Sequence, residues 1–139
     1  MSARDMSELA GCREAWRLSL ERASLSLGDL DCVETHDCFT IAELMQYEAM
    51  GLAAPGQGAR VLEEGVVHPG GRLPVNLSGG LKAKGHPIGA TGVSMHVIAA
   101  RQVTGTAGDM QVPGAELACV FNMGGTAVAN YVSVLEAAK

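Results

Sequence analysis

Apolar residues at the start of the chain recur at helical spacing. Between about Glu8 and Ser24 they lie three or four positions apart, and the charged residues fall largely on the other side. Within this run Arg17 and Glu21 form an i,i+4 pair of opposite charge. The pattern predicts an amphipathic helix that buries one face, and it places Cys12 on that face as a small hydrophobic residue.

A short apolar run over residues 30–35 predicts a strand, because it follows a break containing Gly28. This run leads directly into His36-Asp-Cys-Phe39. Ligands of α/β folds bind at the carboxyl ends of strands, so His36 and Cys38 become candidate site residues.

The next helix is predicted to begin directly after this motif. Thr40 and Glu43 form the T-x-x-E pattern of a capping box, and a helical stripe that includes Ile41 continues to Ala49. A helix N-terminus close to Cys38 would favour its thiolate form.

The middle of the chain carries weaker signals. Residues 57–64 are compatible with a short helix, and residues 65–73 are predicted to form a loop that carries His68 on the surface. Residues 74–76 are expected to form a short strand that enters a glycine-rich stretch.

The glycine-rich stretch reads Asn76-Leu-Ser-Gly-Gly-Leu-Lys-Ala-Lys-Gly-His-Pro-Ile-Gly-Ala-Thr-Gly92. Glycine is favoured where the backbone needs a positive φ or approaches a ligand closely. Five glycines around His86 therefore indicate a loop shaped to present that imidazole. The alternative is a flexible connector in which the histidine is incidental.

The last third of the chain predicts one helix and two strands. Dense apolar residues over 93–104 predict a nearly fully buried helix, with His96 packed on it. Residues 115–121 and 126–135 are rich in strand-forming residues and are expected to join at 122–125. The predicted fold of residues 1–139 is a single α/β layered domain with a mixed β-sheet and a buried helix.

Composition narrows the class of protein. The chain is 47% hydrophobic, carries a formal charge of −5 and contains 4% aromatic residues. These values fit a globular core and argue against nucleic acid or an anionic membrane as partner. Four cysteines without a CxxC pair fit a reduced, cytoplasmic compartment.

Several familiar motifs are absent. The glycine-rich stretch contains neither a P-loop nor the G-x-G-x-x-G fingerprint, and no G-x-S-x-G elbow is found in the chain. A zinc site built from His36, Cys38 and His86 lacks a recognised ligand spacing, and no metal is expected.

What remains is a thiol, two imidazoles and the backbone N–H groups around Gly124 and Gly125. Such parts suit acyl transfer or carbon–carbon chemistry beside a thioester.

The glycine-rich stretch resembles the signature of the C-terminal domain of the thiolase superfamily. His36-Asp-Cys-Phe39 resembles the corresponding motif of the sterol-carrier-protein-type thiolase branch, where most thiolases have Asn-Glu-Ala-Phe. The resemblance runs from about Glu8 to Leu135 and implies a layered thiolase-like half-domain whose first strand is missing. It also implies an acyltransferase of lipid metabolism, such as fatty acid β-oxidation, and a homo-oligomer.

The resemblance implies roles by position. His86 would deprotonate the nucleophilic cysteine and help to form the first oxyanion hole. His36 stands where most thiolases have the Asn that holds a water in that hole. Cys38 would be the acid/base thiol, replacing the cysteine of the usual Cys-x-Gly motif, which reads Asn122-Met-Gly124 here. Gly124 would offer its N–H to the second oxyanion hole.

The resemblance also implies what this chain lacks. In thiolases an N-terminal half carries the cysteine that becomes acylated, and a loop region binds coenzyme A. Coenzyme A and acyl-CoA are therefore expected as substrates, with no covalently bound cofactor, and the missing half is expected in cis or in trans. Two other functions stay open: a thiolase-like retro-aldolase acting on acyl-CoA thioesters, and a non-catalytic half-domain that binds a partner.

Overall fold

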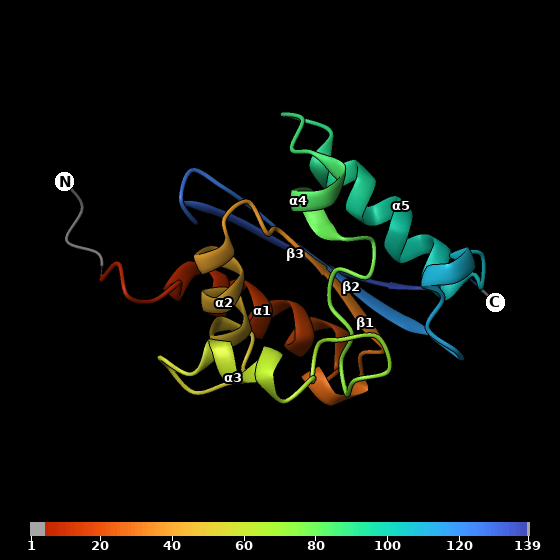
Figure 1. The fold of residues 1–139 in the computed structure, drawn as a ribbon, viewed down its shortest axis with the longest axis horizontal. Coiled ribbons are helices and arrows are strands. Elements are labelled where there is room, and N and C mark those ends of the chain that lie inside the picture. Colours follow the sequence, from red (N-terminus) through yellow and green to blue (C-terminus); the bar gives the residue numbers. More distant parts are fainter. Residues whose placement is uncertain (1–4, 139) are drawn as a thin grey trace.

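A three-stranded sheet with the order β1-β2-β3 stands at the centre of the fold (Figure 1). The computed structural model describes residues 5–138. Its strands are β1 (Cys32–Thr35), β2 (Leu117–Gly124) and β3 (Ala129–Glu136). Its α-helices are α1 (Ala10–Ala23), α2 (Thr40–Ala49), α3 (Gly58–Glu63), α4 (Gly80–Lys84) and α5 (Thr91–Val103), with short 3-10 turns at Leu27–Asp29 and Gly108–Met110.

The sheet is mixed, as predicted. β1 pairs parallel to β2 with Thr35 opposite Phe121, and β2 pairs antiparallel to β3 with Gly124 opposite Ala129. The hairpin turn lies later than the predicted join at 122–125. Asn122 continues the ladder with β3, so that the chain reverses over residues 125–128 instead.

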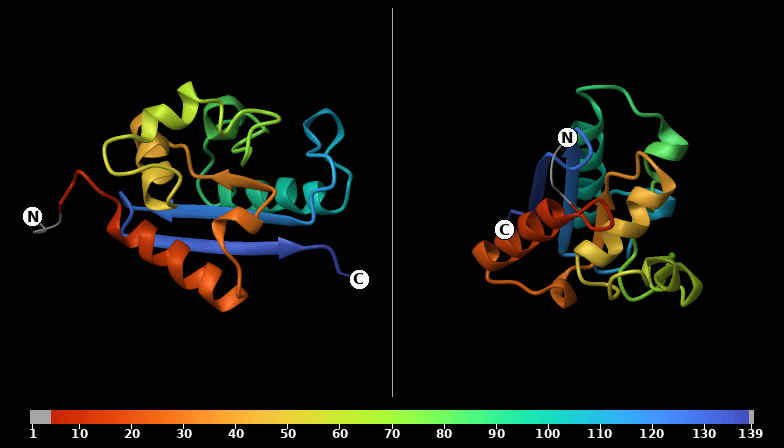
Figure 2. Two further views of the ribbon diagram at one scale, coloured as in Figure 1. Left: turned by 90° about the horizontal axis from the view of Figure 1, so that it is seen from below. Right: turned by 90° about the vertical axis from the view of Figure 1, so that its left-hand side faces the viewer.

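Helices cover both faces of the sheet, which confirms the layered α/β prediction. On one face Val33, Cys119 and Phe121 belong to the core cluster that also includes residues of α1 and α2. On the other face, alternate residues such as Cys32 and Val120 pack against α5. Figure 2 shows α1 and α5 on opposite sides of the strands.

α1 has the predicted amphipathic character. Trp16 is 2% exposed and stacks on Phe121 of β2, with 6.4 Å between the ring centroids. Cys12 is fully buried, and burial raises the pKa of its thiol to about 12, as expected of a core residue. On the outer side, Arg17 donates to Glu21 at 2.7 Å.

The prediction that the helix over 93–104 is nearly fully buried is wrong. α5 buries Met95 and Ala99 against the sheet, but Val93 is 65% and Val97 48% exposed. The helix meets the sheet along one face, so the apolar residues on its other face remain at the surface. His96 is partly buried and hydrogen-bonded within the helix, as predicted: its Nδ1 lies 2.7 Å from the carbonyl oxygen of Gly92.

The predicted start of α2 is also corrected. The N-cap position is Phe39, no side chain caps the helix, and Thr40 is the first helical residue. Glu43 is unavailable for a capping box because its carboxylate contacts Asn76 and Lys82. The apolar stripe is rotated as well: Ile41 is 62% exposed, whereas the buried residues are Ala42, Gln46, Tyr47 and Ala49.

The remaining predictions fare unevenly. α3 confirms the short helix over 57–64, and His68 is exposed as expected. The strand predicted at 74–76 is reduced to a single parallel bridge between Val33 and Val75. The glycine-rich stretch includes the short helix α4, which a loop prediction misses. Within residues 5–138 no helix has the length and apolarity needed to cross a membrane.

We predict that Trp16→Ala lowers the free energy of unfolding by about 3–5 kcal/mol, because it removes a large side chain that joins α1 to the sheet. Leu18→Ala on the same helix is the matched control. Leu18 lies at the surface, and its loss should cost about 0.5 kcal/mol or less. Urea unfolding of both variants measures the difference, and equal losses would contradict this account of the core.

Candidate active site

A cavity of about 780 Å³ opens at the carboxyl ends of β1 and β2. Its lining includes all four residues predicted from the sequence: His36, Cys38, His86 and Gly124. They come from three separate segments of the chain. The structure thus brings the predicted site residues together, while their chemical roles stay predictions.

The register of the strands explains why His36 and Gly124 lie close together. β1 and β2 are parallel, and Thr35 pairs with Phe121. The residues that follow these partners therefore leave the same edge of the sheet side by side. His36 emerges next to Asn122, and Gly124 follows two residues later at the end of β2.

The rings of the two histidines are in direct edge contact in the wall of the cavity. The ring centroids of His36 and His86 lie 4.8 Å apart, and the rings are nearly perpendicular at 85°. His36 is buried at 4% exposure, whereas His86 is exposed. The pair thus consists of one imidazole that is buried in the protein and one that an incoming group can reach.

Burial and a neighbouring charge both act on His36. Burial lowers the pKa of its imidazole, and a positive charge on His86 lowers it further. The side chains of Asn122 and Asp37 act in the opposite direction without reversing the result. His36 is therefore neutral at neutral pH and can accept or donate a hydrogen bond there.

The sequence-based expectation of a thiolate at Cys38 is wrong. Burial raises the pKa of the Cys38 thiol, and the backbone N–H groups of Phe39 and Cys38 only partly oppose that rise. The start of α2 does not outweigh the loss of solvent. Cys38 is thus a protonated thiol at neutral pH, suited to giving a proton rather than to attacking carbon.

The other three cysteines are core residues. Cys12, Cys32 and Cys119 are all buried. Burial raises the pKa of Cys32 to about 12 and raises that of Cys119 still further above its ordinary value. None of the three lines the cavity among the described residues.

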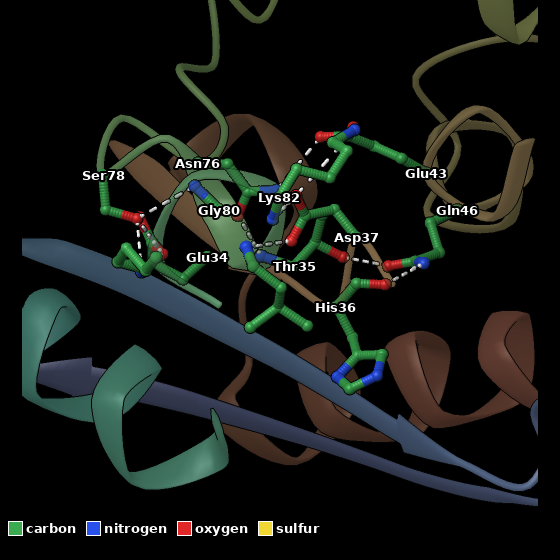
Figure 3. A network of polar contacts seen from close by, with 12 residues as sticks. Glu34, Thr35, His36, Asp37, Glu43, Gln46, Asn76, Ser78, Gly80 and Lys82 are labelled. Atoms are coloured by element: carbon green, nitrogen blue, oxygen red, sulfur yellow. Dashed lines mark hydrogen bonds and ion pairs between the residues drawn. The ribbon is translucent and has the colours of Figure 1, made fainter. Parts of the chain in front are cut away.

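The glycine-rich stretch is held in place by polar contacts with β1 (Figure 3). The backbone N–H of Thr35 donates to Asn76 Oδ1 at 2.8 Å. The Ser78 hydroxyl donates to Glu34 Oε2 at 2.8 Å, and Lys84 Nζ lies 3.3 Å from the same oxygen. Consecutive residues of one strand thus fix the beginning and the middle of the stretch that carries His86.

α2 is attached to the same segment from the other side. The buried Gln46 side chain donates to the backbone carbonyl of His36 at 2.7 Å and accepts from the Thr35 hydroxyl. Figure 3 shows the His36 ring pointing away from this polar network. The backbone of His36 is therefore fixed while its ring remains available to the cavity.

Sequence reasoning missed the residues that build this network. Glu34 and Gln46 belong to none of the motifs found in the sequence. Asp37 and Asn76 lie inside the two motifs, but neither is assigned a role there. A signal was present nevertheless: acidic side chains stand at position 34 inside the buried strand β1 and at position 37, two residues after its end. Buried carboxylates require partners, and the glycine-rich stretch supplies them.

Apolar side chains form most of the remaining wall. Phe39, Ile41 and Ile88 line the cavity and are largely exposed, Ile88 at 99%. A mainly apolar cavity with a few converging polar groups is typical of a small-molecule site. Across residues 5–138 no cluster of three or more His, Cys, Asp or Glu side chains is arranged to hold a metal ion.

Comparisons with known proteins identify the family of this chain. The family model described as thiolase C-terminal domain-like matches residues 1–137. An acetyl-CoA acetyltransferase of Methanothermobacter thermautotrophicus is 43% identical over 123 residues, which cover 88% of this chain and 32% of that protein. Sterol carrier protein 2 of Homo sapiens is 46% identical over 112 residues, which cover 81% of this chain and 20% of that protein.

A solved structure named Ltp2-ChsH2(DUF35) aldolase shares the fold. The TM-score is 0.75 at 24% identity, and the match covers 90% of this chain and 31% of that chain. This chain therefore spans between about a fifth and a third of the length of the proteins to which it is similar.

We predict that Cys38 is the first cysteine to react with iodoacetamide, because the other three are buried. Its raised pKa implies a smaller thiolate fraction than that of a free thiol at the same pH, so its rate should still be rising above pH 9.0, the ordinary thiol value. Mass spectrometry over a pH series measures the rate. Cys38→Ser is the control for assignment, and a midpoint below 9.0 would contradict the burial argument.

Proposed function

The chain belongs to the thiolase C-terminal domain-like family, and we propose that it forms the C-terminal part of a thiolase-type acyl-CoA acyltransferase. The observation that carries this proposal is the single cavity in which His36, Cys38, His86 and Gly124 meet. The proposed reaction is cleavage of a 3-ketoacyl-CoA by coenzyme A, or the reverse Claisen condensation.

Thiolysis needs three kinds of group. A cysteine thiolate attacks the keto carbon, the carbon–carbon bond breaks, and its electron pair leaves with the acetyl-CoA fragment, which takes up a proton. Coenzyme A then receives the acyl group from the cysteine, and its thiol proton returns to a base. Hydrogen-bond donors stabilise the oxyanions that form on the way.

This chain supplies the acid, the base and the donors. His86, exposed beside the cavity, would take the proton from the nucleophilic thiol. Cys38, protonated because burial raises its pKa, would give a proton to the carbanion of the leaving fragment. His86, with a water held by the neutral His36, would stabilise the first oxyanion, and the backbone N–H of Gly124 would stabilise the second.

The acylated cysteine is proposed to come from a segment other than these 139 residues. Cys12, Cys32 and Cys119 are buried in the core, and Cys38 is a thiol suited to proton transfer. The exposed His86 and the apolar rim of the cavity support a site that is completed by a second domain, the cysteine-bearing half, in cis or in trans.

A retro-aldolase acting on acyl-CoA thioesters is the second candidate. The same cysteine arrangement supports it, because an aldolase does not need a nucleophilic thiol. A histidine at the cavity could take the proton of the β-hydroxyl, whose oxygen becomes the carbonyl of the released aldehyde or ketone as the carbon–carbon bond breaks. The electron pair passes to the thioester enolate, which the oxyanion donors would stabilise and the thiol would protonate. The two functions differ in their products: only a thiolase consumes free coenzyme A.

We predict that His86→Ala and Cys38→Ala each lower kcat for 3-ketoacyl-CoA thiolysis by about 10² or more in the enzyme assembled with the cysteine-bearing half. His68→Ala is the matched control, because His68 is exposed and does not line the cavity. Steady-state assays that follow thioester absorbance measure the rates.

Two results would overturn the thiolase proposal. The first is thiolysis at the wild-type rate in both site variants. The second is release of an aldehyde or ketone without consumption of free coenzyme A, which would establish the aldolase instead.

A further inference from the structure

Asp37 stands between His36 and Cys38 in the sequence, yet its side chain points into the glycine-rich stretch rather than into the cavity (Figure 3). It is fully buried at 0% exposure. Its Oδ1 accepts the backbone N–H of Leu81 at 2.6 Å, and its Oδ2 accepts that of Lys82 at 3.3 Å. A carboxylate that takes two N–H groups from one short helix fixes both the position and the direction of that helix.

Asp37 and the backbone of Gly80 are in such close contact that no side chain fits between them. A Cβ on Gly80 would lie 2.2 Å from Asp37 Oδ2, and the φ of Gly80 is +66°. Only glycine meets both demands, because other residues would collide with the carboxylate and rarely adopt this φ. Gly80 is therefore the residue that lets α4 approach Asp37 closely.

A lysine of α4 lies close to the Asp37 carboxylate. Lys82 Nζ lies 3.8 Å from Asp37 Oδ2 and also contacts Glu43. A buried carboxylate without such partners would cost several kcal/mol. The hydrogen bonds from two backbone N–H groups and the nearby ammonium offset that cost.

We propose that Asp37 is a positioning residue that sets the distance between His36 and His86. Its backbone is continuous with His36, and its carboxylate holds α4, which ends at Lys84, two residues before His86. One side chain thus connects the two segments that carry the two imidazoles. This inference rests on the proposed function only in treating these two histidines as working groups.

The electrostatic coupling between the histidines reports their distance without any turnover. The titratable groups around His36 are His86 from the loop before α5 and Asp37 and Cys38 on its own segment. The carboxylates of Asp5 and Glu8 line the same cavity from the segment at the start of α1. A double-mutant cycle exchanges only His86 and Asp37. Every other group around His36 is the same in all members of the cycle, so its effect on the titration midpoint of His36 cancels.

The experiment measures the titration midpoint of His36 by NMR in four versions of the full chain: wild type, His86→Gln, Asp37→Asn and the double variant. In the wild-type background, loss of His86 should raise the midpoint, because the charge of His86 lowers the pKa of His36. Asparagine replaces one of the two carboxylate oxygens by an NH2 group, which cannot accept a hydrogen bond, so one of the two N–H groups loses its acceptor. In the Asp37→Asn background the shift should therefore fall to less than half.

A purely structural role for Asp37 would give a different result. Asp37→Asn would then lower the melting temperature and leave the shift unchanged, and that outcome overturns the proposal. Failure of the thiolase proposal is distinguishable, because it would appear in product analysis while this coupling persisted.

Gly80→Ala provides a second route to the same contact, with Gly89→Ala as its matched control. Both glycines have positive φ, at +66° and +78°, but nothing lies within 4 Å of a Cβ on Gly89. Only Gly80→Ala should reduce the His36–His86 coupling, and equal effects of the two would contradict the proposal.

If neither site variant folds, hydrogen exchange in the wild-type chain decides. The Leu81 amide should exchange as slowly as the amides of β2, because its proton is held by a buried carboxylate. Exchange at the rate of an exposed loop amide would overturn the proposal.

Discussion

The short strand β1 is bonded along both of its edges, and the site depends on this constraint. One edge pairs with β2 in parallel register. On the other, Val33 donates to the carbonyl of Pro74 at 3.0 Å and accepts from the N–H of Asn76 at 2.9 Å. The residues that follow β1 therefore leave the sheet between the end of β2 and the glycine-rich stretch. Three loops that are distant in sequence meet because the four-residue strand β1 is hydrogen-bonded to β2 on one edge and to residues 74–76 on the other.

The polar residues of this junction serve position more than stability. Burying Glu34 and Asp37 removes two carboxylates from water, and burial raises the pKa of Glu34. Their partners, Ser78 and Lys84 for the first and backbone N–H groups for the second, offset that cost. What these contacts provide is a defined conformation. A glycine-rich stretch is entropically costly to order, and the contacts hold it in one conformation beside the cavity.

The sequence predicted the elements that bury a regular apolar pattern. The amphipathic face of α1, the buried strand β1 and the pairing of β2 with β3 all follow from local periodicity. Some predictions failed where a contact that local periodicity does not encode decides the structure. Gln46 is buried in α2, where it binds the backbone of His36. Of the predicted apolar stripe Ala49 is buried as expected, whereas Ile41 is exposed. Gly124 remains in β2 because β3 pairs with it, although two adjacent glycines favour a turn.

The same distinction applies to the site. His36, Cys38, His86 and Gly124 could be proposed from residue type, motif and resemblance, and they line one cavity. Asp37 could not, because its role lies in a contact with backbone N–H groups that no side-chain pattern encodes. The central claim is that this junction brings the two imidazoles into direct edge contact. A nuclear Overhauser measurement between the ring protons of His36 and His86 in the full chain tests it most directly. The account predicts a direct cross-peak between the two rings, and its absence with both rings assigned would contradict the account.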